Sequence, residues 1–296
     1  MTIHLARTLA CAFAALTLLS HSVIGAETES EIQIFTRLAE DGDSVAQYIL
    51  GTSYHAALEV TQDYKKAAYW LQKSAEQGKA EAQYLYGIMF YHGQYVDKDL
   101  TKAFDLFRKA ADQGDIEAQF QIGIAYFQGT ALKEDYKESA KWLLKSAKQG
   151  HAEAQHNIGI LYREGRGVIQ DDKEAVKWIR KAAEQGHVGA QFKVGFRYFK
   201  GHGVIQDYKE AVKWTRKAAE QGDNLAQGLL GMMYHFGKGV IQDYVQAHAW
   251  YNVASANGNK LGAEDRDEVA KLMTPEQIAK AQELAKEYFE KYQPKK

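Results

Sequence analysis

A glycine recurs every 36 residues along most of this chain. An Ala-x-Gln segment leads into most copies, and an Ala-Gln pair begins four residues after the glycine. The recurring residues are Gly42, Gly78, Gly114, Gly150, Gly186, Gly222 and Gly258. A fixed period of roughly 20–50 residues indicates a solenoid, in which each repeat buries its apolar face against its neighbours. The period therefore decides the fold class before any other feature is considered.

The first half of each unit is predicted to be a helix that begins near the Ala-Gln pair and contains an interior glycine. These glycines are Gly51, Gly87, Gly123, Gly159, Gly195 and Gly231. A glycine inside a helix costs about 1 kcal/mol relative to alanine, so its repetition predicts close approach of another helix. An aromatic residue follows three positions later, as Tyr162 follows Gly159, and we expect it to fill the groove that the glycine opens.

The second helix of each unit is predicted to begin at an aspartate, which is a strong N-cap because its carboxylate accepts unpaired backbone N–H groups. The aspartates are Asp63, Asp99, Asp135, Asp171, Asp207 and Asp243. In three units Glu138, Glu174 or Glu210 follows three residues later, which predicts a capping box. A Gly-x-Gly-Val loop precedes the aspartate in the last three units, and the 36-residue glycine ends the helix.

These motifs together resemble the Sel-1-like repeat (SLR) family over residues 43–258. The motifs are Ala-Gln, Leu-Gly-x-x-Tyr, Gly-x-Gly-Val, Asp-Tyr-x-x-Ala, Trp and Lys-Ala-Ala-Glu-Gln-Gly. The resemblance implies an all-α fold similar to tetratricopeptide arrays: a right-handed α-solenoid of stacked antiparallel helix pairs. Members of the family are mostly scaffolds, adaptors and receptors, many of them in bacterial envelopes.

The ends of the chain differ from the repeats. Residues 1–26 have the layout of a signal peptide: Arg7, an apolar stretch over 9–19, and expected cleavage after Ala26. That apolar stretch is shorter than the about 20 residues of a spanning helix, although an uncleaved anchor is the alternative. A solenoid needs capped ends, so we expect a capping helix in 27–42 and capping helices in 259–296. The sole cysteine, Cys11, lies in the expected signal peptide.

The sequence contains no motif that predicts a catalytic, cofactor or metal site. Thirty-seven basic and thirty-eight acidic residues lack the basic excess of a nucleic-acid-binding protein. The sequence contains no Gly-x-Ser-x-Gly elbow and no His-Glu-x-x-His motif, and its Gly-x-Gly loops lack the remaining P-loop residues. His151 and His187 share a repeat position, and one repeat separates them too widely to share a zinc ion. We therefore expect no enzyme.

Positions that vary between otherwise similar units are the candidates for recognition. The preferred row combines aromatic residues with an arginine, the types that supply most binding energy at protein interfaces. It consists of His55, Tyr91, Phe127, Arg163, Phe199 and His235, expected on the concave face. A second row, which includes Ile160 and Phe196, is expected mainly to pack in the core, whereas a third, with His156 and Phe192, is also a candidate.

These observations predict an exported bacterial scaffold that binds a protein or peptide in the periplasm or after secretion. We expect a monomer with no membrane span after signal cleavage. One alternative is an envelope enzyme acting on cell-wall peptides or β-lactams, because cysteine-rich members of the resembled family are linked to β-lactams. However, the family-type cysteines and a Ser-x-x-Lys motif are missing here. Another alternative is a saccharide-binding module, although five tryptophans at one periodic position favour packing.

Overall fold

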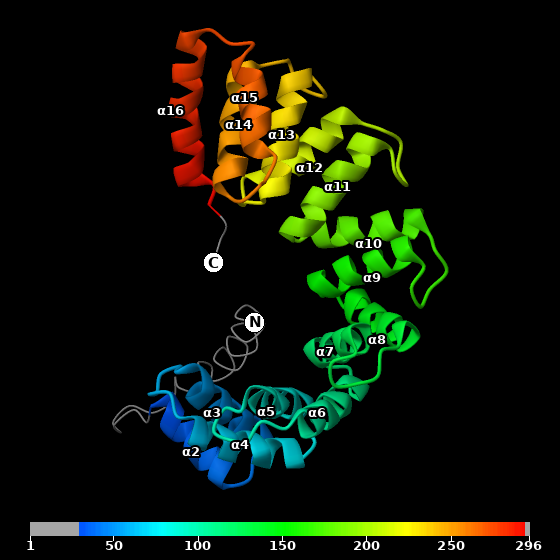
Figure 1. The fold of residues 1–296 in the computed structure, drawn as a ribbon. Helices are drawn as coiled ribbons and strands as arrows, with labels where there is room; N and C mark the ends of the chain where they lie inside the picture. Colours follow the sequence, from blue (N-terminus) through cyan, green and yellow to red (C-terminus); the bar gives the residue numbers. More distant parts are fainter. Residues whose placement is uncertain (1–29, 294–296) are drawn as a thin grey trace, which may run out of the picture. The chain divides into compact units, whose positions relative to one another are not determined.

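The computed structural model describes residues 30–293, which form fifteen helices and no strand (Figure 1). The helices are α2 (Glu31–Glu40), α3 (Ser44–Ala56), α4 (Tyr64–Glu76), α5 (Ala80–His92), α6 (Leu100–Asp112), α7 (Ile116–Gln128), α8 (Tyr136–Lys148), α9 (Ala152–Glu164), α10 (Asp172–Glu184), α11 (Val188–Lys200), α12 (Tyr208–Ala219), α13 (Asn224–Phe236), α14 (Tyr244–Ala256), α15 (Gly262–Ala270) and α16 (Pro275–Lys291). The expected signal peptide, with Cys11 and the cleavage position at Ala26, lies outside the described residues. No helix in the described range is long and apolar enough to cross a membrane.

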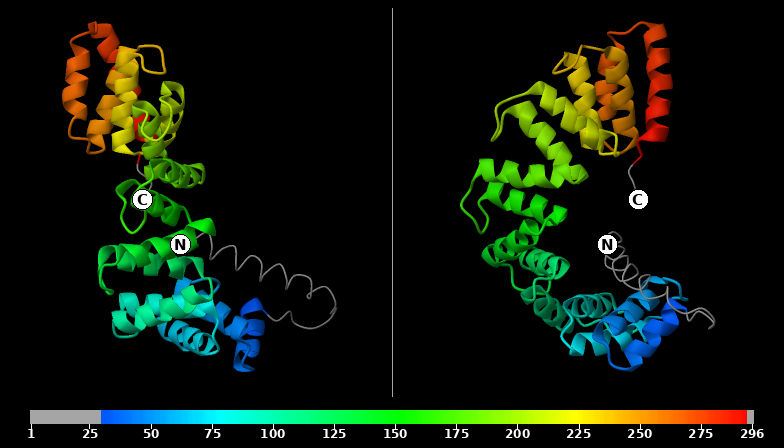
Figure 2. Two further views of the ribbon diagram at one scale, coloured as in Figure 1. Left: turned by 90° about the vertical axis from the view of Figure 1, so that its right-hand side faces the viewer. Right: turned by 180° about the vertical axis from the view of Figure 1, so that it is seen from behind.

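The chain divides inside α7 into two compact units, one ending at Ile122 and the other beginning at Gly123. In the first unit each helix from α2 to α6 packs on the next one along the chain. In the second unit the same holds from α8 to α14, and both α15 and α16 pack on α14 (Figure 2). This sequential packing of helix pairs confirms the predicted all-α solenoid.

The interior glycines mark the closest approach between the two helices of a repeat, as predicted. A Cβ atom on Gly159 would lie 2.5 Å from Cγ1 of Ile179 and 3.0 Å from the carbonyl oxygen of Ala175. In every repeat the space above the glycine is filled by a side chain of the second helix. These side chains are Leu71, Phe107, Leu143, Ile179, Thr215 and Tyr251.

The expectation that the following aromatic residue fills this space was wrong. Tyr198 instead packs against a cluster formed by neighbouring helices, which includes Ile179 and Trp214. Its hydroxyl accepts a hydrogen bond from Nη1 of Arg180 at 3.1 Å. The residue that meets the glycine lies 20 positions further along the chain, where the direction of the second helix brings it over the first.

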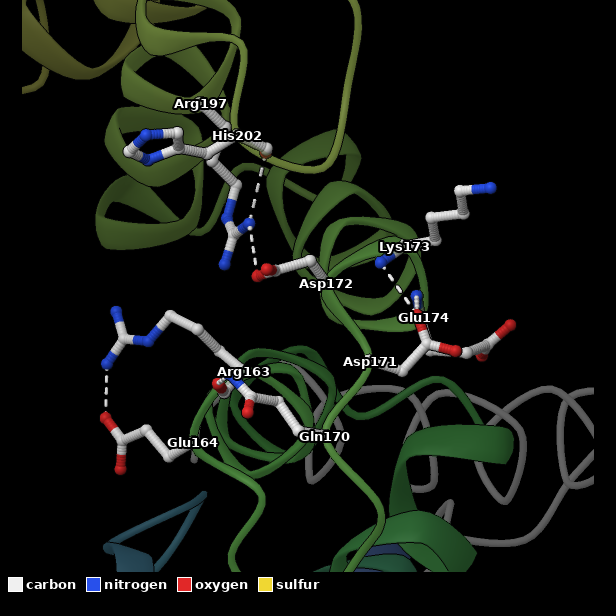
Figure 3. Close-up of polar contacts among 9 residues, drawn as sticks. All are labelled: Arg163, Glu164, Gln170, Asp171, Asp172, Lys173, Glu174, Arg197 and His202. Carbon is white, nitrogen blue, oxygen red and sulfur yellow. Dashed lines mark hydrogen bonds and ion pairs between the residues drawn. The ribbon is translucent and has the colours of Figure 1, made fainter.

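The aspartate N-caps are confirmed in all six second helices. Oδ1 of Asp171 accepts the backbone N–H groups of Lys173 at 2.8 Å and Glu174 at 3.0 Å (Figure 3). The predicted capping box is wrong, because the N–H of Asp171 already donates to the carbonyl oxygen of Tyr162 at 2.9 Å. Glu174 pairs with Nζ of Lys177 instead, and Glu138 and Glu210 likewise pair with the lysine three residues later.

A ladder of glutamines explains why the Ala-Gln and Gln-Gly signatures recur. Gln155 is buried, and its Nε2 donates to the carbonyl oxygen of Ala147 at 3.0 Å, at the end of the preceding helix. Its Oε1 accepts from Nε2 of Gln185 at 2.8 Å, and Gln185 also donates to the carbonyl oxygen of Gly150. Gln191 repeats the arrangement one unit later. Each buried glutamine therefore connects three helices through hydrogen bonds.

The helices beyond the last repeat pack against it. The hydroxyl of Tyr288 in α16 donates to Oε1 of Gln246 at 2.9 Å, and the ring of Tyr292 stacks on Trp250 with centroids 5.6 Å apart. The capping box predicted at Thr274 and Gln277 is present, with the two reciprocal hydrogen bonds at 2.9 and 3.3 Å. At the other end α2 packs on α3, the first helix of the first repeat.

Candidate functional site

The six residues of the preferred row lie in the last turn of the first helices, where most of them pack on the second helix of their own repeat. In the first unit, His55 is 8% exposed and contacts the ring of Tyr64, and Tyr91 contacts Phe104. In the second unit the corresponding pairs are Phe127 with Tyr136, Phe199 with Tyr208 and His235 with Tyr244, with centroids 5.5–5.8 Å apart. The aromatic members of the row are therefore partly used inside the repeat.

The fourth helix pair, α9 with α10 (repeat 4), departs from this pattern because Arg163 and Asp172 replace the two aromatic residues (Figure 3). The next pair, α11 with α12, is repeat 5. The Arg163 side chain is 42% exposed and pairs with Glu164. Nε of Arg166 lies 3.3 Å from the other oxygen of the same carboxylate. Two guanidinium groups thus share one carboxylate, which leaves this corner of the repeat with a positive charge.

Asp172 forms an ion pair with a buried arginine of the next repeat. Arg197 is 6% exposed, and its Nη1 contacts Oδ1 of Asp172 at 3.3 Å and the carbonyl oxygen of His202 at 3.2 Å (Figure 3). Other repeats place small or apolar residues at this position, mostly buried. They are Ser53, Met89, Ala125, Leu161 and Met233. The Arg197–Asp172 pair therefore joins repeats 4 and 5, with the guanidinium group buried and the carboxylate half-exposed.

A stacked histidine pair lies between the same two repeats. The rings of His156 and His187 lie 4.5 Å apart at an interplanar angle of 29°. His187 also caps α11, because its Nδ1 accepts the backbone N–H of Ala190 at 3.1 Å, and His151 caps α9 in the same way. Burial lowers the pKa of His156 to about 3, and the positive charges of His187, Lys193 and Arg163 act in the same direction.

The histidines do not form a metal centre. Within residues 30–293, no group of three or more His, Cys, Asp or Glu side chains is arranged to hold a metal ion. The 36-residue period relates His151 to His187, whereas the contact in the structure is between His156 and His187. That contact joins different repeat positions, so the period alone gives no signal for it.

Three of the four exposed large apolar side chains on the first helices belong to α11 and α13, and the fourth is Val45 of α3. Phe196 is 38% exposed, and Leu225 and Phe236 of α13 are 54% and 57% exposed. Nζ of Lys200 lies 5.8 Å from the ring centroid of Phe196. Phe192 and Lys193 lie on the same side of α11 as Phe196, one turn earlier. We call Phe192, Lys193, Phe196, Lys200, Leu225 and Phe236 the α11–α13 face.

Two residues of this face, Phe196 and Phe192, belong to the second and third rows of variable positions identified in the sequence, not to the preferred row. Phe196 belongs to the row expected mainly in the core, where Thr52 and Ile88 are indeed buried. Phe192 belongs to the third row and is partly buried. The signal that could have found the face is the change of residue type between copies: Lys193 and Lys200 occupy positions held by Asn157 and Glu164 one repeat earlier.

A profile described as the Sel1 repeat matches six consecutive segments of the chain: 44–79, 80–115, 116–151, 152–187, 188–223 and 224–259. Among solved structures, the chain is similar to a protective antigen present in uropathogenic Escherichia coli strains that displays an SLR fold. The identity is 38% over 89% of this chain and 56% of the antigen, with a TM-score of 0.79. The chain thus spans little more than half the length of that antigen.

The chain is also similar to a Sel1 repeat protein from Oxalobacter formigenes. The identity is 34% over 86% of this chain and 76% of that protein, with a TM-score of 0.64. No curated protein sequence matches the chain at a significant level.

Proposed function

Because the chain belongs to the Sel1 repeat family, we propose that it is an exported bacterial adaptor that binds a protein or peptide in the cell envelope. Sel1 repeat proteins generally mediate protein–protein interactions, and the scaffold is typically non-catalytic. The formal charge of −1 suits a protein partner better than a nucleic acid. The proposal includes a monomeric chain that acts in the periplasm or after secretion.

The observation that supports partner binding most directly is the α11–α13 face. Phe196, Leu225 and Phe236 expose large apolar side chains on the first helices of two consecutive repeats. Large apolar side chains exposed at equivalent faces of neighbouring helices favour an interaction site, and aromatic residues supply much of the binding energy at such sites.

Two observations support the envelope location. Residues 1–26 carry the charge, apolar stretch and small residues of a signal peptide. The similar Escherichia coli protein is a protective antigen, and we take this as support for a location outside the cytoplasm. The envelope location is tested by fractionation of the native bacterium and N-terminal sequencing of the mature chain. We expect a chain beginning at Glu27 outside the cytoplasm; an unprocessed cytoplasmic chain would contradict the proposal.

Site-specific photo-crosslinking in living cells tests partner binding. A photoreactive amino acid at position 196 should give a discrete adduct with a partner, because Phe196 lies on the proposed face. The control places the same amino acid at Lys177, which is exposed on the second helix of repeat 4. Equal adducts at both positions, or none at position 196, would count against a binding role for the first helices.

A further inference from the structure

We propose that the α11–α13 face binds a peptide segment in which carboxylates alternate with large apolar side chains. The inference rests on the proposed function and names the chemistry of its partner. It combines three observations: an apolar floor with exposed side chains, two lysines that form no ion pair within the described residues, and a preceding repeat that holds Asn157 and Glu164 at the positions of these lysines.

The apolar floor extends from the exposed side chains into the core of the second unit. Phe192, Phe199 and Met232 pack against one buried cluster that α12, α13 and α14 form. Phe196 contacts Phe192 with ring centroids 6.1 Å apart, and its outer side remains exposed. Covering apolar area of this kind favours a complex because it removes that area from water. A partner therefore gains most by placing apolar side chains over Phe196 and Phe236.

The charge of the face is positive. Helices α11 and α13 contain no aspartate or glutamate, whereas α11 contains Lys193, Arg197 and Lys200. Asp172 engages Arg197, but no ion pair within the described residues involves Lys193 or Lys200. Lys200 lies over the rings of Phe196 and Phe199. A carboxylate arriving at the face thus meets two ammonium groups that form no ion pair of their own.

An ion pair with a partner carboxylate would stabilise Lys193 more than Lys200, because Lys193 is partly buried. Its side chain is partly buried, and burial lowers the pKa of its ammonium group. The nearby charges are those of Arg163 and Arg197, which disfavour the ammonium form, and of Asp223 and Glu164, which favour it. Asp223 accepts the backbone N–H of Ala226, and Glu164 is shared by two arginines. A partner carboxylate would offset the cost of holding this charge in a partly buried position.

The spacing of the lysines predicts the spacing of the carboxylates. Lys193 and Lys200 are seven residues apart on one helix face, or about 10 Å along the axis. In an extended peptide, side chains at positions i, i+2 and i+4 point to the same side, and the outer two lie about 13 Å apart. The partner segment is therefore expected to present an acidic, an apolar and a second acidic residue at these three positions, with the apolar residue over Phe196.

The preceding repeat shows which other side chains this scaffold carries at the positions of Lys193 and Lys200. Asn157 and Glu164 of α9 occupy the positions of Lys193 and Lys200 on the same kind of helix. The variant K193N/K200E therefore changes the charge of the face with side chains native to this repeat position. The control K280N/K286E makes the same change of charge on exposed positions of α16.

The test measures fluorescence anisotropy of short synthetic peptides with the purified full chain. One peptide carries Glu, Phe, Glu and Leu at every second position, with Ser between them, so that all four point to one side of an extended chain; matched peptides carry Gln or Lys for Glu, or Ser for the apolar residues. We expect the acidic apolar peptide to bind about tenfold more tightly than the Gln peptide, and K193N/K200E to lose about tenfold while K280N/K286E does not. Raising the salt from about 50 to 500 mM should weaken binding, because exposed charges are screened.

Other outcomes overturn the inference in distinguishable ways. Equal binding of the Lys peptide, or equal losses in both charge variants, would show that the face does not select acidic segments. Self-association of the chain that K193N/K200E abolishes, measured by sedimentation, would show that the face binds a second copy instead. If crosslinking at position 196 captures a partner that K193N/K200E still binds, the proposed function stands and this inference fails.

Discussion

At the scale of single residues, the buried glutamines show how a polar side chain can be a structural part of a repeat. Gln191 is 5% exposed and bonds to the carbonyl oxygen of Ala183 and to Gln221. A carbonyl at the end of a helix lacks the donor that a following turn would supply, and that of Ala183 accepts the backbone N–H of Gly186 instead. The glutamine adds a second donor to the same carbonyl, and the next repeat satisfies the glutamine in turn.

Replacement of Gln191 by leucine should therefore destabilise the protein although it makes the core more apolar. The carbonyl oxygen of Ala183 keeps the backbone N–H of Gly186 but loses the side-chain amide, and the amide of Gln221 loses its acceptor. Loss of these two hydrogen bonds costs about 1–3 kcal/mol. Urea unfolding measures the change, with Gln282→Leu on the exposed side of α16 as the control. An equal effect of both substitutions would mean that the ladder contributes nothing to stability.

His156 gives the protein a pH-dependent stability. Its pKa is lowered to about 3 by burial and nearby positive charge, whereas an unfolded histidine has a pKa of about 6.5. Between these values the unfolded chain binds the proton and the folded chain does not. Stability contributed here is therefore fully present above pH 6.5 and falls as the pH falls. His187 also makes stability fall as the pH falls, because burial lowers its pKa and a protonated Nδ1 cannot accept the N–H of Ala190.

The substitution His156→Phe should remove part of this acid sensitivity. Phenylalanine is native to the position, since Phe120 and Phe192 occupy it in the adjacent repeats. We expect the variant to gain about 2–3 kcal/mol relative to the original chain between pH 7.5 and pH 4.5, because one pKa unit corresponds to about 1.4 kcal/mol. Urea unfolding at both pH values checks this; parallel pH profiles of the two proteins would rule the mechanism out.

At the scale of helices, the interior glycines set the distance between the two helices of a repeat. The sequence indicated a close approach, because a helix has no other reason to repeat a residue that weakens it. The contact partner could not be read in the same way, because the register between two helices depends on the loop that joins them. Ile179 rather than the following aromatic residue covers Gly159 for this reason.

Alanine at Gly159 should destabilise the protein despite its better helix propensity. The added methyl group would overlap Ile179 and the backbone of Ala175, and overpacking of this kind costs about 1–3 kcal/mol. Gly189 is the control, because a Cβ atom there meets nothing closer than 3.5 Å. Thermal unfolding should show a lower midpoint for Gly159→Ala and an unchanged or higher one for Gly189→Ala; the reverse order would refute the packing argument.

At the scale of the whole molecule, each repeat is stabilised by its neighbours, so the last repeat depends on the helices that follow it. Tyr288 and Tyr292 cover Trp250 of α14, and Tyr288 also bonds to Gln246. In stacked repeats the loss of one interface is felt mainly next to it, because stability is a sum of local terms. The effect of uncapping one end should thus remain at that end.

The substitution Tyr288→Ala should raise hydrogen exchange in α13 and α14 and leave α3 to α6 unchanged. The expected loss of stability is about 3–5 kcal/mol for a large aromatic residue in a packed interface. Phe289→Ala on the same helix is the control, because that side chain is 41% exposed. A uniform rise in exchange across the chain would indicate that the repeats unfold as one cooperative body.

The sequence by itself determined the period, the helix pairs, the aspartate caps and the interior glycines, because each depends on neighbouring residues or on comparison of equivalent positions. Binding by the row from His55 to His235 stays a prediction, although its aromatic members pack within their own repeats. Only the tertiary structure decided the glutamine ladder, the Arg197–Asp172 pair and the open α11–α13 face. These features arise where residues of different helices meet, and the register that brings them together is set by packing rather than by the period.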